Sequence, residues 1–261
     1  MHQADHLARQ TARADIEPVM APRFSLIIPA HNEAQFLPSL LDSVEEAKRR
    51  YGGAGAIEVV VVDNASTDST AEIALKRGCR LVRERKRVIA AVRNRGAAEA
   101  RGELLAFTDA DATVHPELFN AIDGALATGR YVAGATGVRL ERVSPGIAAA
   151  YMILVPMVWV TGMDTGVVFC RREDFLAVGG YNEELLFGED VQFLLAMRRL
   201  GKSRGRKLGR LRSVKSVSST RKFDKYGDWH YVAMLLRFGY WYLFAPRRMN
   251  EFALDYWYGE R

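Results

Sequence analysis

The chain has few cysteines and no long apolar segment. Cys79 and Cys170 are its two cysteines among 261 residues, and their wide separation matches neither a disulfide framework nor a metal-ligand spacing. The longest apolar run, residues 147–160, contains Pro156 and is shorter than the roughly 20 residues that a bilayer-spanning helix needs. Residues 1–22 lack the apolar centre of a secretory signal, and we interpret them as a flexible leader. These absences predict a cytoplasmic protein with reduced thiols and no transmembrane span.

Two familiar phosphate-binding loops are also missing. The sequence contains no Gly-x-x-x-x-Gly-Lys-Ser/Thr, which excludes a P-loop ATPase, and no Gly-x-Gly-x-x-Gly follows the first predicted strand, which excludes a dinucleotide-binding loop there. The formal net charge of +6 still favours an anionic partner, unless the basic surface serves solubility alone. No basic segment interleaved with aromatic residues forms a nucleic-acid-binding face, so we expect no nucleic-acid partner.

Apolar runs alternate with helical patterns through the first half of the chain. Short apolar runs typical of strands buried on both faces occupy residues 24–29, 57–62, 80–82 and 104–107. Apolar residues at helical spacing predict helices over residues 36–50, 69–76, 89–100 and 118–126. This alternation predicts an α/β fold, with a mostly parallel sheet and helices on both faces.

The pattern changes near residue 144. Further strands are expected at residues 131–135, 167–170 and 211–217, and a helix that opens at Glu189-Asp190 runs to residue 200. We interpret residues 23–143 as one half of a domain, residues 144–222 as its second half, and residues 223–261 as a helical tail rich in aromatic residues.

Two aspartates follow the predicted strand at residues 104–107. Because a buried carboxylate without partners is very costly, Asp109 and Asp111 must emerge at the carboxyl edge of the sheet, where open α/β sheets bind ligands. Asp63 follows another strand and is expected at the same edge. Two hard oxygen donors one residue apart suit magnesium or manganese carrying a phosphate, although such pairs also occur in solvated turns.

Several short motifs, in this order and at strand ends, together resemble a family 2 glycosyltransferase with the GT-A fold. They are Pro29-Ala30-His31-Asn32-Glu33, Val62-Asp63-Asn64-Ala65-Ser66-Thr67-Asp68, Arg93-Asn94-Arg95-Gly96, Asp109-Ala110-Asp111, Gly179-Gly180-Tyr181 and Glu189-Asp190. The resemblance implies transfer of a sugar from a UDP- or GDP-type nucleotide diphosphate donor to an unidentified hydroxyl acceptor. It also implies inversion at the anomeric carbon and use of Mn²⁺ or Mg²⁺. Residues 23–143 then become the nucleotide-sugar-binding half, and residues 144–222 the acceptor and catalytic half.

The resemblance also implies roles for individual residues on the donor side. It puts Ala30 and Glu33 beside the nucleoside, Asp63 on the base, Asp109 near the ribose or the metal, and Asp111 on the metal as its principal ligand. Many relatives have an aspartate where this chain has Asn64, and some have other residues at positions 30 and 31, which affects base selectivity more than fold. For Asp63, a helix-capping turn is the structural alternative.

Glu189 and Asp190 are candidates for the catalytic base. Adjacent helical residues point about 100° apart, so at most one of the two aims at a given reacting atom. Periodicity does not choose between them, whereas the family pattern assigns the base to Asp190. Alternatively, both acids stabilise the positive end of their helix.

Three basic residues are candidates for the diphosphate: Arg93, Arg221 and Lys222. Arg93 could instead lie on a solvated helix face, and Arg221 and Lys222 could continue the solvated charge run at residues 204–215. The aromatic residues of the tail either pack on the body or contact a membrane surface from the cytoplasmic side.

Two other functions compete with sugar transfer. One is a non-catalytic protein of the same fold that binds a nucleotide or a membrane surface. The other is a sugar-phosphate nucleotidyltransferase, which ranks lower because the glycine-rich basic loop expected after the first strand is missing.

Overall fold

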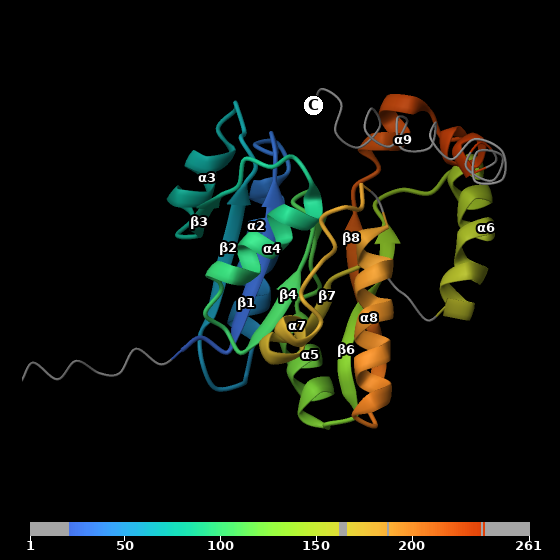
Figure 1. The fold of residues 1–261 in the computed structure, drawn as a ribbon. Helices are drawn as coiled ribbons and strands as arrows, with labels where there is room; N and C mark the ends of the chain where they lie inside the picture. The colour runs from blue at the N-terminus through green and yellow to red at the C-terminus, as the bar shows by residue number, and fades with distance from the viewer. Residues whose placement is uncertain (1–20, 162–165, 187, 236, 238–261) are drawn as a thin grey trace, which may run out of the picture.

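The computed structural model describes residues 21–161, 166–186, 188–235 and 237. Within them, one eight-stranded sheet has the order β3-β2-β1-β4-β7-β6-β8-β5 (Figure 1). The strands are β1 Phe24–Ala30, β2 Ile57–Asp63, β3 Arg80–Arg83, β4 Leu104–Phe107, β5 Ala112–Thr113, β6 Tyr131–Leu140, β7 Val168–Arg171 and β8 Lys207–Ser218. The helices are α2 Leu37–Arg50, α3 Thr70–Lys76, α4 Ile89–Glu99, α5 Leu118–Ala127, α6 Pro145–Thr161, α7 Arg172–Ala177, α8 Glu189–Ser203 and α9 Arg221–Tyr226.

The sheet is mostly parallel, which confirms the predicted fold class. Strands β3, β2, β1 and β4 run parallel, and β6 runs parallel to β8. The antiparallel pairs are those of β7 with β4 and β6, and that of β5 with β8. Because β7 lies between β4 and β6, strands from both predicted halves form one continuous sheet. The division near residue 143 therefore separates halves of one sheet, and it stays a prediction.

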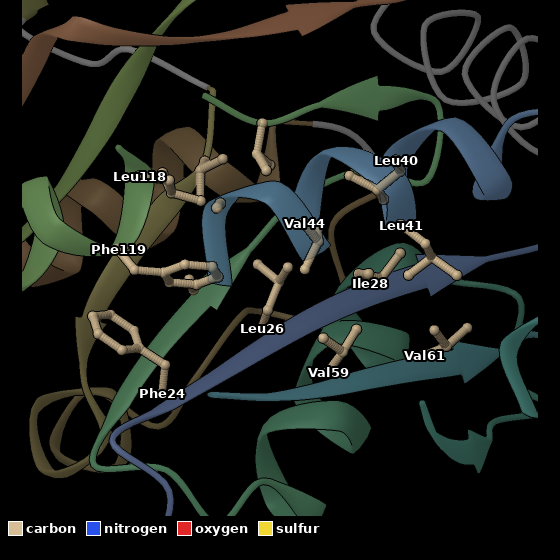
Figure 2. Packing of buried hydrophobic residues seen from close by; sticks show 14 of the residues in the cluster. Phe24, Leu26, Ile28, Leu40, Leu41, Val44, Val59, Val61, Leu118 and Phe119 are labelled. Atoms are coloured by element: carbon tan, nitrogen blue, oxygen red, sulfur yellow. The ribbon is translucent and has the colours of Figure 1, made fainter. Parts of the chain in front are cut away.

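Each face of the sheet is covered by its own helices. Alternate residues of β1 explain this, since successive side chains of a strand point to opposite faces. Figure 2 shows Leu26 and Ile28 packed with Val44 of α2, while Ile27 belongs to a second cluster with Val92 of α4. Each fully buried leucine or isoleucine contributes about 1.5–3 kcal/mol relative to an exposed one. The two clusters hold the carboxyl ends of the strands in fixed positions.

A close approach brings α4 onto the sheet. A Cβ atom built on Gly96 would lie 2.5 Å from a methyl carbon of Ile27 and 2.8 Å from one of Val62, so any larger residue would push the helix outward. Arg93 lies one turn before Gly96 on the same helix and is buried. The glycine therefore sets the depth at which Arg93 enters the molecule.

The later strands are longer than predicted. The strands expected at residues 131–135 and 211–217 extend over Tyr131–Leu140 and Lys207–Ser218 in β6 and β8.

Arg142, just after β6, binds Asp224 of α9 at 3.0 Å and Asp228 at 2.8 Å, which ties the loop before α6 to the segment after β8. None of the described helices is long and apolar enough to cross a bilayer.

The two ends of the chain extend beyond the described residues. The predicted leader lies almost wholly outside them, as do the tail aromatics from Phe238 onward. Where the tail is described, Tyr231 stacks on Phe223 with 4.8 Å between ring centroids, whereas Trp229 is exposed. The start of the tail therefore packs on α9.

Candidate active site

A cavity of about 860 Å³ opens at the carboxyl ends of β1 and β4. Its wall combines the loop after β1, the ends of α4 and α8, residues 109–111 after β4, and parts of β6, β8 and α6. Asp109 and Asp111 after β4 line it together with Glu189 and Asp190 of α8. The arrangement is the one that open α/β sheets use for ligands.

The loops after β1 and β2 brace each other at this edge. Asn32 has a left-handed φ of 52°. Its side-chain oxygen accepts a 2.8 Å hydrogen bond from the backbone amide of Thr67, and its backbone amide donates to the Ser66 hydroxyl at 3.0 Å. Ala65 also has a left-handed φ, 57°, a conformation that costs about 1–2 kcal/mol for a residue with a Cβ atom. The amide of Glu33 donates to Thr70 at 2.8 Å. These contacts hold the loop that carries Glu33 in one position.

Arg93 forms the buried centre of a carboxylate cluster. Its side chain is 5% exposed, and its Nη1 atom lies 2.8 Å from Glu189 and 2.7 Å from Asp190. Its Nη2 atom lies 3.0 Å from Asp109, and its guanidinium stands 5.3 Å from the ring centre of Tyr181. Burial opposes the charge, but Asp190 and Asp109 outweigh it and raise the pKa of Arg93. We call Arg93 with these three carboxylates the Arg93 cluster.

Asp190 has the acid–base properties expected of a catalytic base. Burial raises the pKa of its carboxyl to about 6, with Arg93 opposing the rise and Glu189 adding to it. A base with a pKa near 6 is ionised at neutral pH yet more basic than an ordinary aspartate. The Asp190 side chain is 19% exposed against 11% for Glu189, so it is the more exposed of the two, and both line the cavity.

Arg221 forms a second cluster on the opposite side of the Asp-x-Asp pair. Its Nη1 and Nη2 atoms bind the two oxygens of Glu33 at 2.7 and 2.8 Å, and its Nε atom lies 2.9 Å from Asp111. The guanidinium also lies over the ring of Phe36, 4.8 Å from its centre. Burial opposes the charge, but Glu33 and Asp111 raise the pKa of Arg221. We call Arg221 with Glu33 and Asp111 the Arg221 cluster; it ties the start of α9 to the loops after β1 and β4.

Most residues predicted for the site line this cavity. The described lining includes Ala30, Glu33, Arg93, Asp109, Asp111, Glu189, Asp190, Arg221 and Lys222. The structure overturns the solvated alternatives for the two arginines, because Arg93 is buried and Arg221 is 24% exposed with two carboxylate partners. In the arrangement described here both guanidinium groups contact carboxylates, so their predicted contact with a diphosphate stays a prediction.

Asp63 differs from the other predicted residues. The described residues that line the cavity include its neighbour Asn64 but not Asp63 itself. The Asp63 side chain is largely buried and accepts a 3.1 Å hydrogen bond from the amide of Ser66; this turn caps no helix, because the next helix, α3, begins at Thr70. Asn64 donates to the carbonyls of Glu84 and Lys86 at 2.7 and 3.0 Å. A role of Asp63 on the base stays a prediction.

The carboxylates fit a divalent cation that is bound together with a phosphate. Among the described residues, no group of three or more His, Cys, Asp or Glu side chains is placed to hold a metal by itself. Asp109 and Asp111 supply hard oxygen donors at the cavity wall, and the Asp109 side chain is 57% exposed. Mg²⁺ and Mn²⁺ need only one or two protein carboxylates when phosphate oxygens and water complete their coordination.

Sequence reasoning missed several residues of the lining. His31 and Arg87 contact each other at 2.9 Å and line the cavity, and Arg210, Arg212 and Lys215 line it from β8. The last three were interpreted as part of a solvated charge run. Only their position in the sheet, described below, brings them to the cavity.

Comparison with known proteins finds a family that part of the chain resembles. Residues 25–146 match the family described as Glycosyl transferase family 2. The chain is 34% identical over 108 residues to dolichyl-phosphate beta-glucosyltransferase of Mus musculus, a match that covers 37% of this chain and 33% of that protein. The Drosophila melanogaster protein of the same description is 34% identical over 124 residues, covering 43% of this chain and 38% of that protein. The chain thus spans about a third of the length of these relatives.

Solved structures support the fold. The mannosyltransferase PcManGT from Pyrobaculum calidifontis, in complex with GDP-Man and Mn²⁺, aligns with a TM-score of 0.60 and 23% identity over 82% of this chain and 62% of that chain. S. aureus TarS 1–349 in complex with UDP-GlcNAc aligns with a TM-score of 0.58 and 19% identity over 76% of this chain and 58% of that chain. At these identities the likeness concerns the fold, and it matches the GT-A architecture.

Proposed function

We propose that this chain, whose residues 25–146 match Glycosyl transferase family 2, transfers a sugar from a nucleotide diphosphate donor to an acceptor hydroxyl. The observation that carries the proposal is one cavity lined by both an Asp-x-Asp pair and a carboxylate whose pKa is raised to about 6. The first suits the diphosphate side of a transfer, and the second suits proton removal from an acceptor.

The proposed reaction is a single displacement. The acceptor oxygen attacks the anomeric carbon as Asp190 takes the hydroxyl proton, and the bond between that carbon and the diphosphate oxygen breaks. Attack opposite to the leaving group inverts the anomeric configuration. Arg93 holds the Asp190 carboxylate through a 2.7 Å contact, which keeps the base oriented toward the cavity.

Asp111 would hold Mn²⁺ or Mg²⁺, with Asp109 as a second ligand or as a partner of the ribose. A bound divalent cation would supply neutralising charge to the departing diphosphate. Arg221 and Lys222, which line the cavity beside Asp111, would add positive charge to the same group. Metal dependence is part of the proposal and is supported by the chemistry of the two carboxylates.

The donor is proposed as a UDP- or GDP-linked sugar. Structural neighbours are complexed with UDP-GlcNAc and with GDP-Man, so their ligands support the class and leave the base open. A panel of nucleotide sugars screened by thermal shift with Mn²⁺ tests it. A donor at about 100 times its Kd stabilises the fold by about 2.7 kcal/mol. If no UDP or GDP sugar changes the melting temperature, the proposal fails.

Measuring turnover distinguishes the proposed enzyme from a non-catalytic nucleotide-binding protein. Release of free UDP or GDP from the stabilising donor, with or without an acceptor, supports an enzyme, whereas binding without release supports a nucleotide-binding protein. We further propose a cytoplasmic location, because Cys79 and Cys170 are buried, unpaired thiols. Membrane contact through the aromatic tail is part of the same proposal.

A further inference from the structure

Strand β8 presents three basic residues to the cavity: Arg210, Arg212 and Lys215. In a regular strand, side chains alternate between faces, so Lys215 would point away from the side that carries the other two. The pairing of β8 with β6 removes this conflict. Thr136 pairs with Leu211, but the next residue, Gly137, pairs with Lys215.

The irregularity therefore inserts residues 212–214 into β8. Because the number of inserted residues is odd, the alternation is reversed beyond them, and Lys215 takes the register position that follows Leu211. That position is on the face of Arg210. Bulges of this kind commonly re-aim side chains next to active sites. Here the bulge gathers the positive charge of β8 on the cavity side.

Apolar residues of the neighbouring strand β6 and of α6 also line the cavity. They are Val138 and Leu140 of β6, which pair with Ser216 and Ser218 of β8, and Ala150 and Tyr151 of α6. In Figure 1, α6 stands beyond β6 and β8, apart from the helices that cover the sheet near β1. This end of the cavity thus combines a basic strand with an apolar helix.

The charges of the cavity are divided between its two ends. All five carboxylates of the described lining contact either Arg93 or Arg221. The end of β8 lies beside that region, since Ser218 pairs with Ala112, next to Asp111. A ligand that extends from Asp111 along β8 therefore meets Lys215 first and Arg210 later.

We propose that the acceptor carries a phosphate group besides its attacking hydroxyl, and that Arg210, Arg212 and Lys215 bind this phosphate. The inference rests on the proposed function, because it names the acceptor class of that reaction. Guanidinium groups match phosphate oxygens in geometry, and charge-assisted hydrogen bonds are the strong ones. The apolar wall of α6 accommodates the carbon skeleton next to the phosphate.

Calorimetry with three probes tests the proposal: glycerol 3-phosphate, dihexanoyl phosphatidylglycerol and uncharged dihexanoylglycerol. Each probe is titrated into the protein alone, and into the protein with Mn²⁺ and whichever of UDP or GDP stabilises the protein. The bound nucleotide occupies the diphosphate position, so binding of a probe there is distinguished from binding at β8. We expect both phosphate probes to bind and the uncharged probe to bind much more weakly. Equal affinity for the two phosphate probes indicates a soluble acceptor, and tighter binding of the lipid indicates a headgroup.

The Arg210→Gln/Lys215→Gln double variant should lose roughly tenfold or more in affinity for the phosphate probes. The matched control is Arg101→Gln/Arg130→Gln, which removes the same charge from exposed positions before β4 and β6, at the opposite edge of the sheet. Nucleoside diphosphate affinity should be unchanged in both variants, which also shows that they are folded.

Two results overturn the inference: equal loss in both double variants, or undiminished probe affinity in the β8 variant. A failure of the proposed function would look different. In that case no nucleoside diphosphate would bind the parent protein, whatever the β8 residues do with the phosphate probes.

Discussion

The two arginine clusters of the cavity hold the same kind of partner in different surroundings. Arg93 comes from a helix pressed onto the sheet, is 5% exposed and contacts three carboxylates. Arg221 comes from the segment after β8, is 24% exposed and contacts two. The buried cluster contains the proposed base, and the more accessible cluster contains the proposed metal ligand.

From this difference we expect the Arg93 cluster to hold the proposed base in position and the Arg221 cluster to exchange a partner when a cation binds. Removing one partner from a buried ion pair leaves an uncompensated charge, so the Arg93 cluster is expected to stay intact during the reaction. In the Arg221 cluster, Asp111 can exchange an arginine for a cation while Glu33 keeps its bidentate contact. The base would then be fixed, and the diphosphate side would adapt to its ligand.

The largest expected effect comes from the base itself. Asp190→Asn should lower the transfer rate by about 10²–10⁴-fold, because proton removal by a positioned side chain contributes that much. Donor affinity and melting temperature should be retained, since the raised pKa shows that the ionised carboxyl is unfavourable where it lies. Exposed Glu184, in the loop before α8, provides the control Glu184→Gln. Parental turnover in Asp190→Asn would refute the assignment.

Replacing buried Arg93 should destabilise the protein more than replacing its exposed neighbour Arg95. Arg93→Met should lower the free energy of unfolding by about 3–5 kcal/mol, because Asp109, Glu189 and Asp190 would lose their shared cation. Arg95→Met on the same helix removes an arginine that is 46% exposed and pairs with Glu99, and it should cost less than about 1 kcal/mol. Urea unfolding measures both. Similar losses would mean that the Arg93 cluster does not behave as a buried one.

Replacing the arginine of the Arg221 cluster should lower the free energy of unfolding less than replacing Arg93. We expect Arg221→Met to cost about 1.5–3 kcal/mol, the range for hydrogen bonds to charged groups. Its control is Lys225→Met, an exposed position on α9. If Arg221→Met destabilised the protein as much as Arg93→Met, the proposed contrast between the two clusters would be lost.

Metal-dependent donor binding should depend on Asp111. Asp111→Ala should weaken donor affinity by about tenfold or more in Mn²⁺ and much less in EDTA, because it removes a hard oxygen ligand. Asp42→Ala, which removes an exposed carboxylate paired with Arg77, serves as the control. Calorimetry with and without Mn²⁺ measures both. An equal loss in EDTA would contradict metal binding by Asp111.

The smallest effect concerns pH. Asp190 acts as a base only when ionised, and burial raises its pKa to about 6. The transfer rate should therefore be constant above pH 7 and fall about tenfold per pH unit below pH 6. A pH profile at saturating donor and metal measures it. A constant rate down to pH 5 would show that the base has an ordinary carboxyl pKa.

The positions of some candidate site residues follow from local sequence. Asp109 and Asp111 were placed from the apolar run before them, and structure shows both at the cavity wall. Glu189 and Asp190 were placed at a helix start, and α8 begins at Glu189. In both cases a strand or helix pattern within a few residues determines where the side chain emerges.

Other features depend on residues far apart in the chain. Sequence periodicity left Arg93 open between a solvated face and a ligand site, because its partners are 16, 96 and 97 positions away. The strand at β8 was recognised only in part, and nothing local marks the insertion of residues 212–214.

The sequence by itself determined the alternation of strands and helices, the sheet edge where the carboxylates gather and the resemblance that the family match confirmed. It did so because buried strands, capping positions and short motifs are local properties. Only the tertiary structure decided which cation meets which carboxylate and which face of β8 meets the cavity. Those outcomes depend on burial and strand register, which arise only when distant segments pack together.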